Sequence, residues 1–403
     1  MHSSKSIIGT SGKELLGKRI CLCITGSVAA ARSIDLAREL MRHGADVYCV
    51  MSESAQRLVG PELMHWATGN AVVTKLTGEC EHITLCGETN EKVDLVLVAP
   101  CTANTLGKIA QGIDDTNVTT VCSTALGSKI PLVVVPAMHA SLYNNPFFAG
   151  NVAKLKDNGV VLVEPEMEGG KAKMPENPDI VDYCIRAVSR QSLKGKKVVV
   201  TAGATREFID DVRFISNPGS GRMGIAVARE AWLRGADVAL VVGHCDAGIP
   251  SYLKAVSVVG VREMLEEVKK RAGKAYAIVL AASAGDFTVE KRRGKLDSGK
   301  KVSLGLVPAP KISDSVKKWN PKARLVLFKA ESGASDAALL QKAKAKMAKC
   351  RADLVVANDV SKEGAGFVVG TNDVLIIAKN GKKEKMKGRK AEIAERIISL
   401  ISS

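Results

Sequence analysis

A glycine-rich segment in the second half of the chain has the residue types of an anion-binding turn. Residues 217–224 read NPGSGRMG, follow an apolar β-branched run at 198–201, and open a helical pattern. Unpaired amides and the positive end of the helix macrodipole favour a phosphate at such a helix start. A simpler version, Gly26 and Ser27 after the apolar run 18–25, lies near the other end of the chain. The sequence therefore predicts two nucleotide-handling units.

Other polar residues have side chains suited to proton transfer or to carboxylate binding. His82 and His139 could each act as a base or serve as a structural hydrogen-bonding residue, since an imidazole titrates near neutral pH. Asn104 stands at a helix start after a strand, where capping is its ordinary role. Ser27 could cap the following helix and also donate to a phosphate. Spacing alone leaves these alternatives open.

Apolar strands alternate with helices through the first half, which predicts an α/β fold with a parallel, doubly wound sheet. In such sheets ligands bind at the carboxyl ends of the strands, where the polar residues above fall. The expected strands are 18–25, 45–51, 93–99 and 130–135, and the expected helices 34–43 and 103–111.

The second half repeats the alternation, which predicts a second Rossmann-like sheet, mostly parallel. The expected strands are 198–201, 237–242, 275–281, 325–329, 355–358 and 374–378, and the expected helices 224–234, 261–272, 336–349 and 391–402. Residues 291–309 interrupt the pattern, and we expect a basic loop with an antiparallel excursion there.

A polar segment rich in glycine and proline at 165–178 is expected to be a mobile flap without regular structure. A helix is expected at 179–190, and residues 191–197 should form a hinge. A chain of 403 residues is too long for one ordinary core. We therefore predict two domains, 1–190 and 191–403.

Composition narrows the class of protein. Hydrophobic content of 46% and charged content of 25% are typical of globular chains. No apolar run reaches the roughly 18 residues of a membrane span, residues 1–18 lack a signal-peptide block, and we expect a cytoplasmic protein. The ten cysteines have no zinc-type spacing, which favours reduced thiols and no structural metal. Cys21 and Cys23 should share one face of a buried strand.

The net charge of +16 is uneven. Residues 1–190 hold 18 Lys and Arg against 20 Asp and Glu, whereas residues 191–403 hold 40 against 22, a net charge of +18. A field of that sign attracts anionic ligands, either nucleic acid or small polyanions such as nucleoside triphosphates. Only 4% of the residues are aromatic and no nucleic-acid module is present, so small polyanions are favoured.

Motifs of the first half resemble the flavin-containing cysteine decarboxylases. They are residues 26–30 (GSVAA), 81–85 (EHITL), 99–110 (APCTANTLGKIA) and 136–139 (PAMH). Motifs of the second half resemble phosphopantothenate–cysteine ligase. They are residues 201–207 (TAGATRE), 212–224 (VRFISNPGSGRMG), 281–287 (AASAGDF) and 357–361 (ANDVS). In this order the two sets resemble the bifunctional phosphopantothenoylcysteine decarboxylase and phosphopantothenate–cysteine ligase family of coenzyme A biosynthesis.

For the first half, the resemblance implies a flavodoxin-like domain that decarboxylates 4′-phosphopantothenoylcysteine to 4′-phosphopantetheine. FMN would oxidise the thiol so that the electrons released with CO₂ have an acceptor. His82 would be the base, Asn104 would bind the substrate carboxylate, and His139 would lie over the substrate. The residues implied for FMN are Gly26, Ser27, Val28, Ser52, Thr102, Ser123 and Met138.

For the second half, the resemblance implies CTP-dependent ligation of 4′-phosphopantothenate with cysteine through an acyl-cytidylate. Asn217 would hold that intermediate, Arg213 would lie near it, and Lys295 would be needed to form it. Asp286, which could also bind Mg²⁺, would line the cytidine pocket with Phe287 and Phe328. The remaining residues implied for substrate or nucleotide are Gly203, Thr205, Arg206, Ser216, Ser220, Gly221, Ala281, Lys311 and Asn358.

The chain departs from the family pattern at two places. His139 stands where the substrate motif usually has asparagine. The flap cysteine that reprotonates the enethiol in many relatives aligns with Glu166. Either another acid serves (Glu166, Glu168 or Cys184), or the last step is slow.

Further expectations concern assembly and the competing classes of protein. The resemblance implies trimeric flavin halves and dimeric ligase halves, with a dodecamer as one such homo-oligomer. The alternatives are a two-domain nicotinamide or flavin oxidoreductase and a basic nucleic-acid-binding protein. Neither turn is a GxGxxG followed by an acidic residue about 20 positions later, which disfavours a nicotinamide enzyme.

Overall fold

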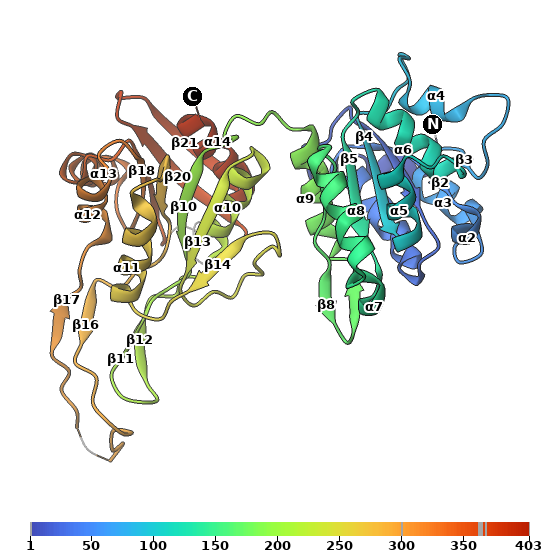
Figure 1. Cartoon of the computed structure of the whole chain (residues 1–403). Coiled ribbons are helices and arrows are strands. Elements are labelled where there is room, and N and C mark those ends of the chain that lie inside the picture. Colours follow the sequence, from blue (N-terminus) through green and yellow to red (C-terminus); the bar gives the residue numbers. More distant parts are fainter. Residues whose placement is uncertain (1, 300, 362–365, 367–368, 403) are drawn as a thin grey trace. The chain divides into compact units, whose positions relative to one another are not determined.

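The computed structural model describes residues 2–299, 301–361, 366 and 369–402. The chain divides into two compact units, Met1–Arg190 and Gln191–Ser403 (Figure 1). Each unit contains its own α/β sheet with helices on both faces, and each is described by itself. None of the helices within the described ranges has the length and apolar character needed to cross a membrane.

The first unit is built on a six-stranded parallel sheet. The strand order is β3-β2-β1-β4-β5-β7, so the chain winds outward in both directions from β1. This is the predicted doubly wound arrangement, in which adjacent loops leave the same edge of the sheet. The strands are β1 (Arg19–Ile24), β2 (Asp46–Met51), β3 (Val72–Val73), β4 (Leu95–Cys101), β5 (Leu132–Pro136) and β7 (Val161–Leu162).

Short helices surround this sheet. In α1, Leu36, Ala37 and Leu40 are fully buried, as their helical spacing predicts, and Gly44 (φ +110°) follows its end. The predicted pair Cys21 and Cys23 is buried in β1, with the two sulfurs 3.8 Å apart. The helices are η1 (Ser3–Ile7), η2 (Val28–Arg32), α1 (Ser33–Arg42), α2 (Glu53–Gln56), α3 (Pro61–Thr68), α4 (Glu81–Cys86), α5 (Ala103–Gln111), α6 (Asn117–Gly127), α7 (Ala140–Tyr143), α8 (Pro146–Asp157) and α9 (Asn177–Val188).

The segment expected to be a flap without regular structure is a β-hairpin, so that prediction was wrong. β8 (Glu166–Glu168) and β9 (Lys171–Lys173) pair antiparallel, and β9 also pairs with β6 (Met138–His139). Gly169 and Gly170 have φ of +56° and +71°, the backbone that a two-residue hairpin turn requires. The glycine pair that suggested mobility is therefore the turn itself.

The second unit is built on an eight-stranded sheet with the order β14-β13-β10-β15-β18-β19-β20-β21. Its first six strands are parallel, and β20 and β21 are antiparallel additions. The predicted, mostly parallel sheet is thus confirmed. The strands are β10 (Lys197–Ala202), β13 (Asp237–Val242), β14 (Lys254–Ser257), β15 (Ala277–Leu280), β18 (Arg324–Glu331), β19 (Leu354–Asp359), β20 (Thr371–Ala378) and β21 (Lys383–Arg389).

Helices cover both faces of this sheet, with one apolar cluster under each layer. Residues of α10 (Arg222–Leu233) and α14 (Lys390–Ser402) belong to the first cluster. The second cluster contains residues of the remaining helices, α11 (Val261–Ala272), α12 (Ile312–Trp319) and α13 (Asp336–Cys350). The arrangement is a three-layer sandwich.

Two antiparallel hairpins extend from one end of the second unit (Figure 1). One pairs β11 (Arg206–Phe208) with β12 (Phe214–Ser216), and the other pairs β16 (Phe287–Val289) with β17 (Leu306–Pro308). The expected antiparallel excursion is confirmed. Hydrogen bonds join the two hairpins, so we refer to residues 206–216 and 287–308 as the arm.

Candidate active sites

Three helices of the first unit begin with hydroxyl caps at one edge of the sheet. Ser27, Ser52 and Thr102 follow β1, β2 and β4, which are neighbours in the sheet. Each side-chain oxygen accepts a hydrogen bond from a first-turn backbone N–H, at 3.3–3.4 Å. The predicted capping role of Ser27 is confirmed. Adjacent helix starts of this kind produce a region of positive potential suited to an anion.

The turn at Gly26 has no room for a side chain. A Cβ on Gly26 would lie 2.5 Å from the Cβ of Ser54. The Ser27 hydroxyl donates to the carbonyl oxygen of Ala137 at 3.3 Å, which ties the turn to the segment before β6. Val28 is 85% exposed, so solvent reaches the start of η2. A tight, open turn of this type fits the phosphate of a nucleotide cofactor.

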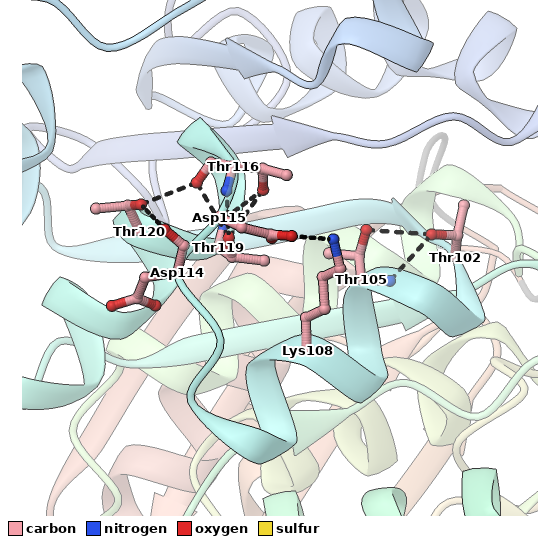
Figure 2. A network of polar contacts seen from close by, with 8 residues as sticks. All are labelled: Thr102, Thr105, Lys108, Asp114, Asp115, Thr116, Thr119 and Thr120. Atoms are coloured by element: carbon pink, nitrogen blue, oxygen red, sulfur yellow. Dashed lines mark hydrogen bonds and ion pairs between the residues drawn. The ribbon is translucent and has the colours of Figure 1, made fainter.

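A polar network fixes the helices that follow β4. Figure 2 shows Thr102 at the start of α5 and Lys108 of the same helix reaching Asp115, with Nζ to Oδ2 at 2.6 Å. Next to Asp115, Thr116 and Thr119 form the capping box of α6. The last turn of α5 and the segment that begins α6 are therefore held together by side chains.

Asn104 does not cap α5, contrary to its expected ordinary role. Thr102 is the cap, and Asn104 is an exposed residue of the first turn. Within the described residues its amide forms no hydrogen bond, so it is available to a ligand. His139 is likewise exposed on β6. Both follow the carboxyl ends of the neighbouring strands β4 and β5. Ser123 on α6 and Met138 on β6 are half-buried.

His82 lies on α4, which packs against α6. Its ring is half-buried, and Nδ1 is a buried atom without a hydrogen-bond partner in the described structure. Buried polar atoms are normally paired, and an orphan requires an explanation such as a missing ligand. Hydrogen bonds from the hydroxyl and amide of Thr77 lower the pKa of Glu81, which keeps that neighbour anionic.

The three candidate acids differ in their surroundings. Glu166 is exposed on β8 and has no ion pair among the described residues. Glu168 pairs with Lys173, and the hydrogen bond from Lys173 lowers the pKa of Glu168. Cys184 is fully buried in α9, and burial raises its thiol pKa well above its usual range. Glu166 is thus the candidate that is both exposed and without an ion pair in the described structure.

The second unit contains a cavity of about 570 Å³ at the carboxyl ends of β10, β15, β18 and β19. Nine residues implied by the sequence line it: Gly203, Asn217, Ser220, Gly221, Ala281, Asp286, Lys311, Phe328 and Asn358. A largely apolar cavity with a few convergent polar groups is the usual form of a ligand site.

Glycines leave the helix start in this cavity open. Gly203 and Gly221 have φ of +75° and +79°, and Gly221 is the N-cap of α10 without a side-chain cap bond. A Cβ on Gly203 would lie 2.4 Å from the carbonyl oxygen of His244. The Asn217 amide donates to the carbonyls of Ser283 (3.5 Å) and Ala284 (3.3 Å). Asn217 therefore fastens the turn across the cavity and does not cap the helix.

Positive charge dominates the wall of the cavity. Asp286 is the one acidic residue among the described lining residues, and it forms an ion pair with Lys311. The cationic lining residues are Arg222, Lys311, Lys329, Lys346 and Lys390. Burial, and then the charge of Arg222, lowers the pKa of Lys390, whose Nζ donates to the carbonyl of Val369 at 2.6 Å. A polyanion is the ligand class that this wall suits.

The sequence analysis did not identify four of these cations (Arg222, Lys329, Lys346 and Lys390), although the net positive charge of the second half indicated an anionic ligand.

Six implied residues are outside the cavity wall: Thr205, Arg206, Arg213, Ser216, Phe287 and Lys295. Thr205 accepts from the amide of Gly285, and the Ser216 hydroxyl donates to the carbonyl of Thr205, so these two brace the wall. The guanidinium of Arg206 lies 4.4 Å from the ring centroid of Phe214 in the arm.

Two carboxylates hold the residues on either side of Lys295. The amide of Gly294 donates to Asp211 at 2.7 Å, and the amide of Leu296 donates to Asp210 at 3.1 Å. Arg213 donates to Asp210 at 3.3 Å and to the carbonyl of Leu296 at 3.2 Å. The arm therefore brings Arg213 next to the exposed Lys295 loop.

Asp210→Asn is expected to release the Lys295 loop and to speed hydrogen exchange there about tenfold, since charge-assisted hydrogen bonds are lost. Burial raises the pKa of Asp210, but the amides of Arg213, Val212 and Leu296 outweigh it, so the net shift is downward. The ionised Asp210 carboxylate stabilises the folded unit fully above its unfolded-state pKa of about 3.9. This contribution is lost as the pH falls through the lowered folded-state pKa of Asp210. Hydrogen exchange at residues 294–296 measures how often the Lys295 loop is released. The control is Asp237→Asn, since Asp237 is exposed on β13. Unchanged exchange in D210N would contradict the role of Asp210 in holding this loop.

Two family models together match nearly the whole chain. The model described as Flavoprotein matches residues 8–189, and the model described as DNA/pantothenate metabolism flavoprotein C-terminal domain matches residues 193–403. The coenzyme A biosynthesis bifunctional protein CoaBC of Thermococcus kodakarensis is 45% identical over 401 residues, with 98% of each chain covered. The chain belongs to the CoaBC family. The resemblance inferred from its motifs is thereby confirmed.

A second relative agrees with the CoaBC assignment. The CoaBC protein of Methanocaldococcus jannaschii is 36% identical, covering 100% of this chain and 97% of its own. A solved C-terminal domain of a CoaBC protein is 29% identical, with a TM-score of 0.44, and covers 53% of this chain and 96% of that domain. As a CoaBC protein the chain is a bifunctional enzyme with a decarboxylase half and a ligase half. The oxidoreductase and nucleic-acid alternatives receive no support.

Proposed function

We propose that the second unit joins 4′-phosphopantothenate to cysteine with consumption of CTP, and that the first unit decarboxylates the product with FMN. The observation that carries the proposal is the cavity of the second unit, where five cations and an open helix start face one carboxylate. The ligands proposed there carry a triphosphate and a phosphomonoester. The proposed first unit binds FMN and a substrate that carries a phosphomonoester, and the Gly26 turn suits the FMN phosphate.

In the ligation, the carboxylate oxygen of phosphopantothenate bonds to the α-phosphorus of CTP as the bond to pyrophosphate breaks. The lining cations offset the charge of the triphosphate, and Lys295 on the arm assists this step. The cysteine amine then bonds to the acyl carbon, CMP leaves, and the amine loses a proton. Asn217 holds the acyl-cytidylate for this attack. Asp286, Phe287 and Phe328 contact the cytidine.

Mg²⁺ fits this site only as a companion of the triphosphate. It usually binds one or two carboxylates together with substrate phosphates. The described residues contain no cluster of three potential metal ligands, and Asp286 already pairs with Lys311. Phosphate oxygens would supply most of its coordination, with Asp286 as the protein ligand.

In the decarboxylation, the residues that would hold the FMN phosphate and its neighbourhood are Gly26, Ser27, Val28, Ser52 and Thr102. Ser123 and Met138 complete that contact surface. FMN, when bound, supplies the oxidation and the returning reduction of the substrate that make loss of CO₂ feasible.

The substrate contacts come from other elements of the same unit. His82 acts as the general base that accepts a proton from the substrate. Asn104 donates its amide to the departing carboxylate, and His139 covers the substrate.

A coupled assay tests both halves together. Protein supplied with phosphopantothenate, cysteine and either CTP or ATP should release pyrophosphate with CTP, followed by CO₂ and phosphopantetheine. Absence of both pyrophosphate and CO₂ would refute the proposal. We further propose a cytoplasmic homo-oligomer built from trimeric and dimeric contacts, a dodecamer, which sedimentation measures.

Glu166→Gln is expected to lower decarboxylase turnover about 100-fold, since a general acid contributes at least that much. The enethiol would no longer be protonated, so oxidised product should accumulate and be detectable by mass spectrometry. Glu168→Gln is the matched control on the same strand. Unchanged turnover in E166Q would show that Glu166 is not the proton donor. Accumulation of oxidised product in E168Q instead would assign the proton-donor role to Glu168.

A further inference from the structure

Arg32 is the last residue of η2, the short helix that begins at the capping residue Ser27. Its guanidinium reaches a segment more than 140 positions away in the sequence. Nη1 donates to the carbonyl of Met174 at 2.8 Å, and Nη2 donates to the carbonyl of Pro175 at 2.9 Å. Nη2 also lies 3.3 Å from the Glu176 carboxylate and 3.3 Å from the Asn177 side-chain oxygen. One side chain thus binds four acceptors in four consecutive residues.

The bound segment is the base of the β8–β9 hairpin. Met174 follows β9 directly and is 2% exposed, and Asn177 begins α9. The same strand of the hairpin is attached to the turn by a second route, because β9 pairs with β6 and Ser27 donates to Ala137, which precedes β6. Both ends of η2 therefore hold the structure from which the hairpin extends.

The chemistry of the contact requires arginine. A guanidinium presents several donors in a fixed plane, whereas a lysine ammonium is a point charge on a flexible stem. Two of the acceptors are the backbone carbonyls of Met174 and Pro175, which every residue type would present at these positions. The contact therefore depends on the donor, Arg32. The side chain is 33% exposed, and the ion pair with the exposed Glu176 is screened by solvent. The two carbonyl bonds therefore carry most of the attachment.

We propose that Arg32 is a positioning residue that couples the cofactor-binding turn to the β8–β9 hairpin. A ligand that orders the turn at Ser27 thereby orders the hairpin and its Glu166 carboxylate. The role of Glu166 rests on the proposed function, but the mechanical coupling does not. No atom of Arg32 needs to touch the substrate for this effect.

Limited proteolysis of the full chain measures the coupling directly, because β9 supplies trypsin sites after Lys171 and Lys173. Cleavage at these bonds, followed by mass spectrometry with and without added FMN, reports how often the hairpin opens. In the unmodified protein, FMN should slow this cleavage. In Arg32→Ala, cleavage without FMN should rise about tenfold, and FMN should no longer slow it. Arg32→Lys should fall between the two.

Arg57→Ala is the matched control, because Arg57 is exposed on the same unit and pairs only with Glu53 in the described structure. Circular dichroism verifies that each variant is folded. Equal protection by FMN in R32A and in the unmodified protein would overturn the coupling. In the decarboxylase assay R32A should lower kcat more than it raises KM, with ligase activity unchanged. Loss of protection in R32A without any decarboxylase activity in the unmodified protein would sustain the coupling and refute the proposed function.

Discussion

His82→Asn is expected to lower decarboxylation by about 100- to 10,000-fold, the usual contribution of a general base. Asparagine preserves a side chain of similar reach on α4 but cannot accept and release the proton. The half-buried His82 ring on α4 is the group on which this expectation rests. Single-turnover CO₂ release from 4′-phosphopantothenoylcysteine is the measurement.

Two controls accompany H82N. The ligase activity of the same chain should be unchanged, because that unit has its own core. His43→Asn, a histidine paired with Glu14 in the same unit, should also retain decarboxylation. Normal CO₂ release by H82N would show that His82 is not the base and that Nδ1 lacks a partner only because of local packing.

Asn217→Asp is expected to reduce complete ligation by roughly 100- to 1,000-fold, as when a donor to a reacting group is removed. A carboxylate cannot donate to the intermediate, and it would be repelled by the carbonyls of Ser283 and Ala284 that Asn217 now binds. Activation depends on the lining cations and on the arm, so pyrophosphate should still appear. One equivalent per site, with acyl-cytidylate retained on the protein, is the expected result by mass spectrometry.

Asn380→Asp provides a matched change in the same unit. Asn380 accepts from the amide of Lys382 in the turn before β21, and an aspartate can preserve that bond. N380D should ligate normally. Multiple turnovers of N217D would reduce the 217–224 segment to a scaffold.

Periodicity predicted the regular elements well where the pattern was strong. Helices at 103–111 and 261–272 and the strand at 237–242 have the predicted bounds. The helix α6 (Asn117–Gly127) was not predicted, since Asn, Val and Thr have low helix propensity. Packing of Val118, Val121, Cys122 and Ala125 in the core stabilises it instead. The Thr116 capping box was its one local indication.

The candidate sites were predictable where one segment supplies them. The turn at 217–224 and its glycines could be recognised from the order of residues alone. Lys346 on α13 and Lys390 on α14 could not, because only the tertiary fold brings these helices to the same cavity. Lys346 lies in a run of alanine and lysine that also fits a solvated helix face.

Part of the positive charge of the second unit lies on β21, the edge strand of its sheet, where it has a different role. In β21, Lys383, Lys385, Lys387 and Arg389 are exposed at alternate positions, and β21 pairs with β20 alone among the described strands. An unpaired strand edge is a template for pairing with another chain, and lysines on it prevent that addition. These cations protect the enzyme from edge-to-edge aggregation. Four of the 40 cations of the second half thus have a role in solubility that is separate from the cavity.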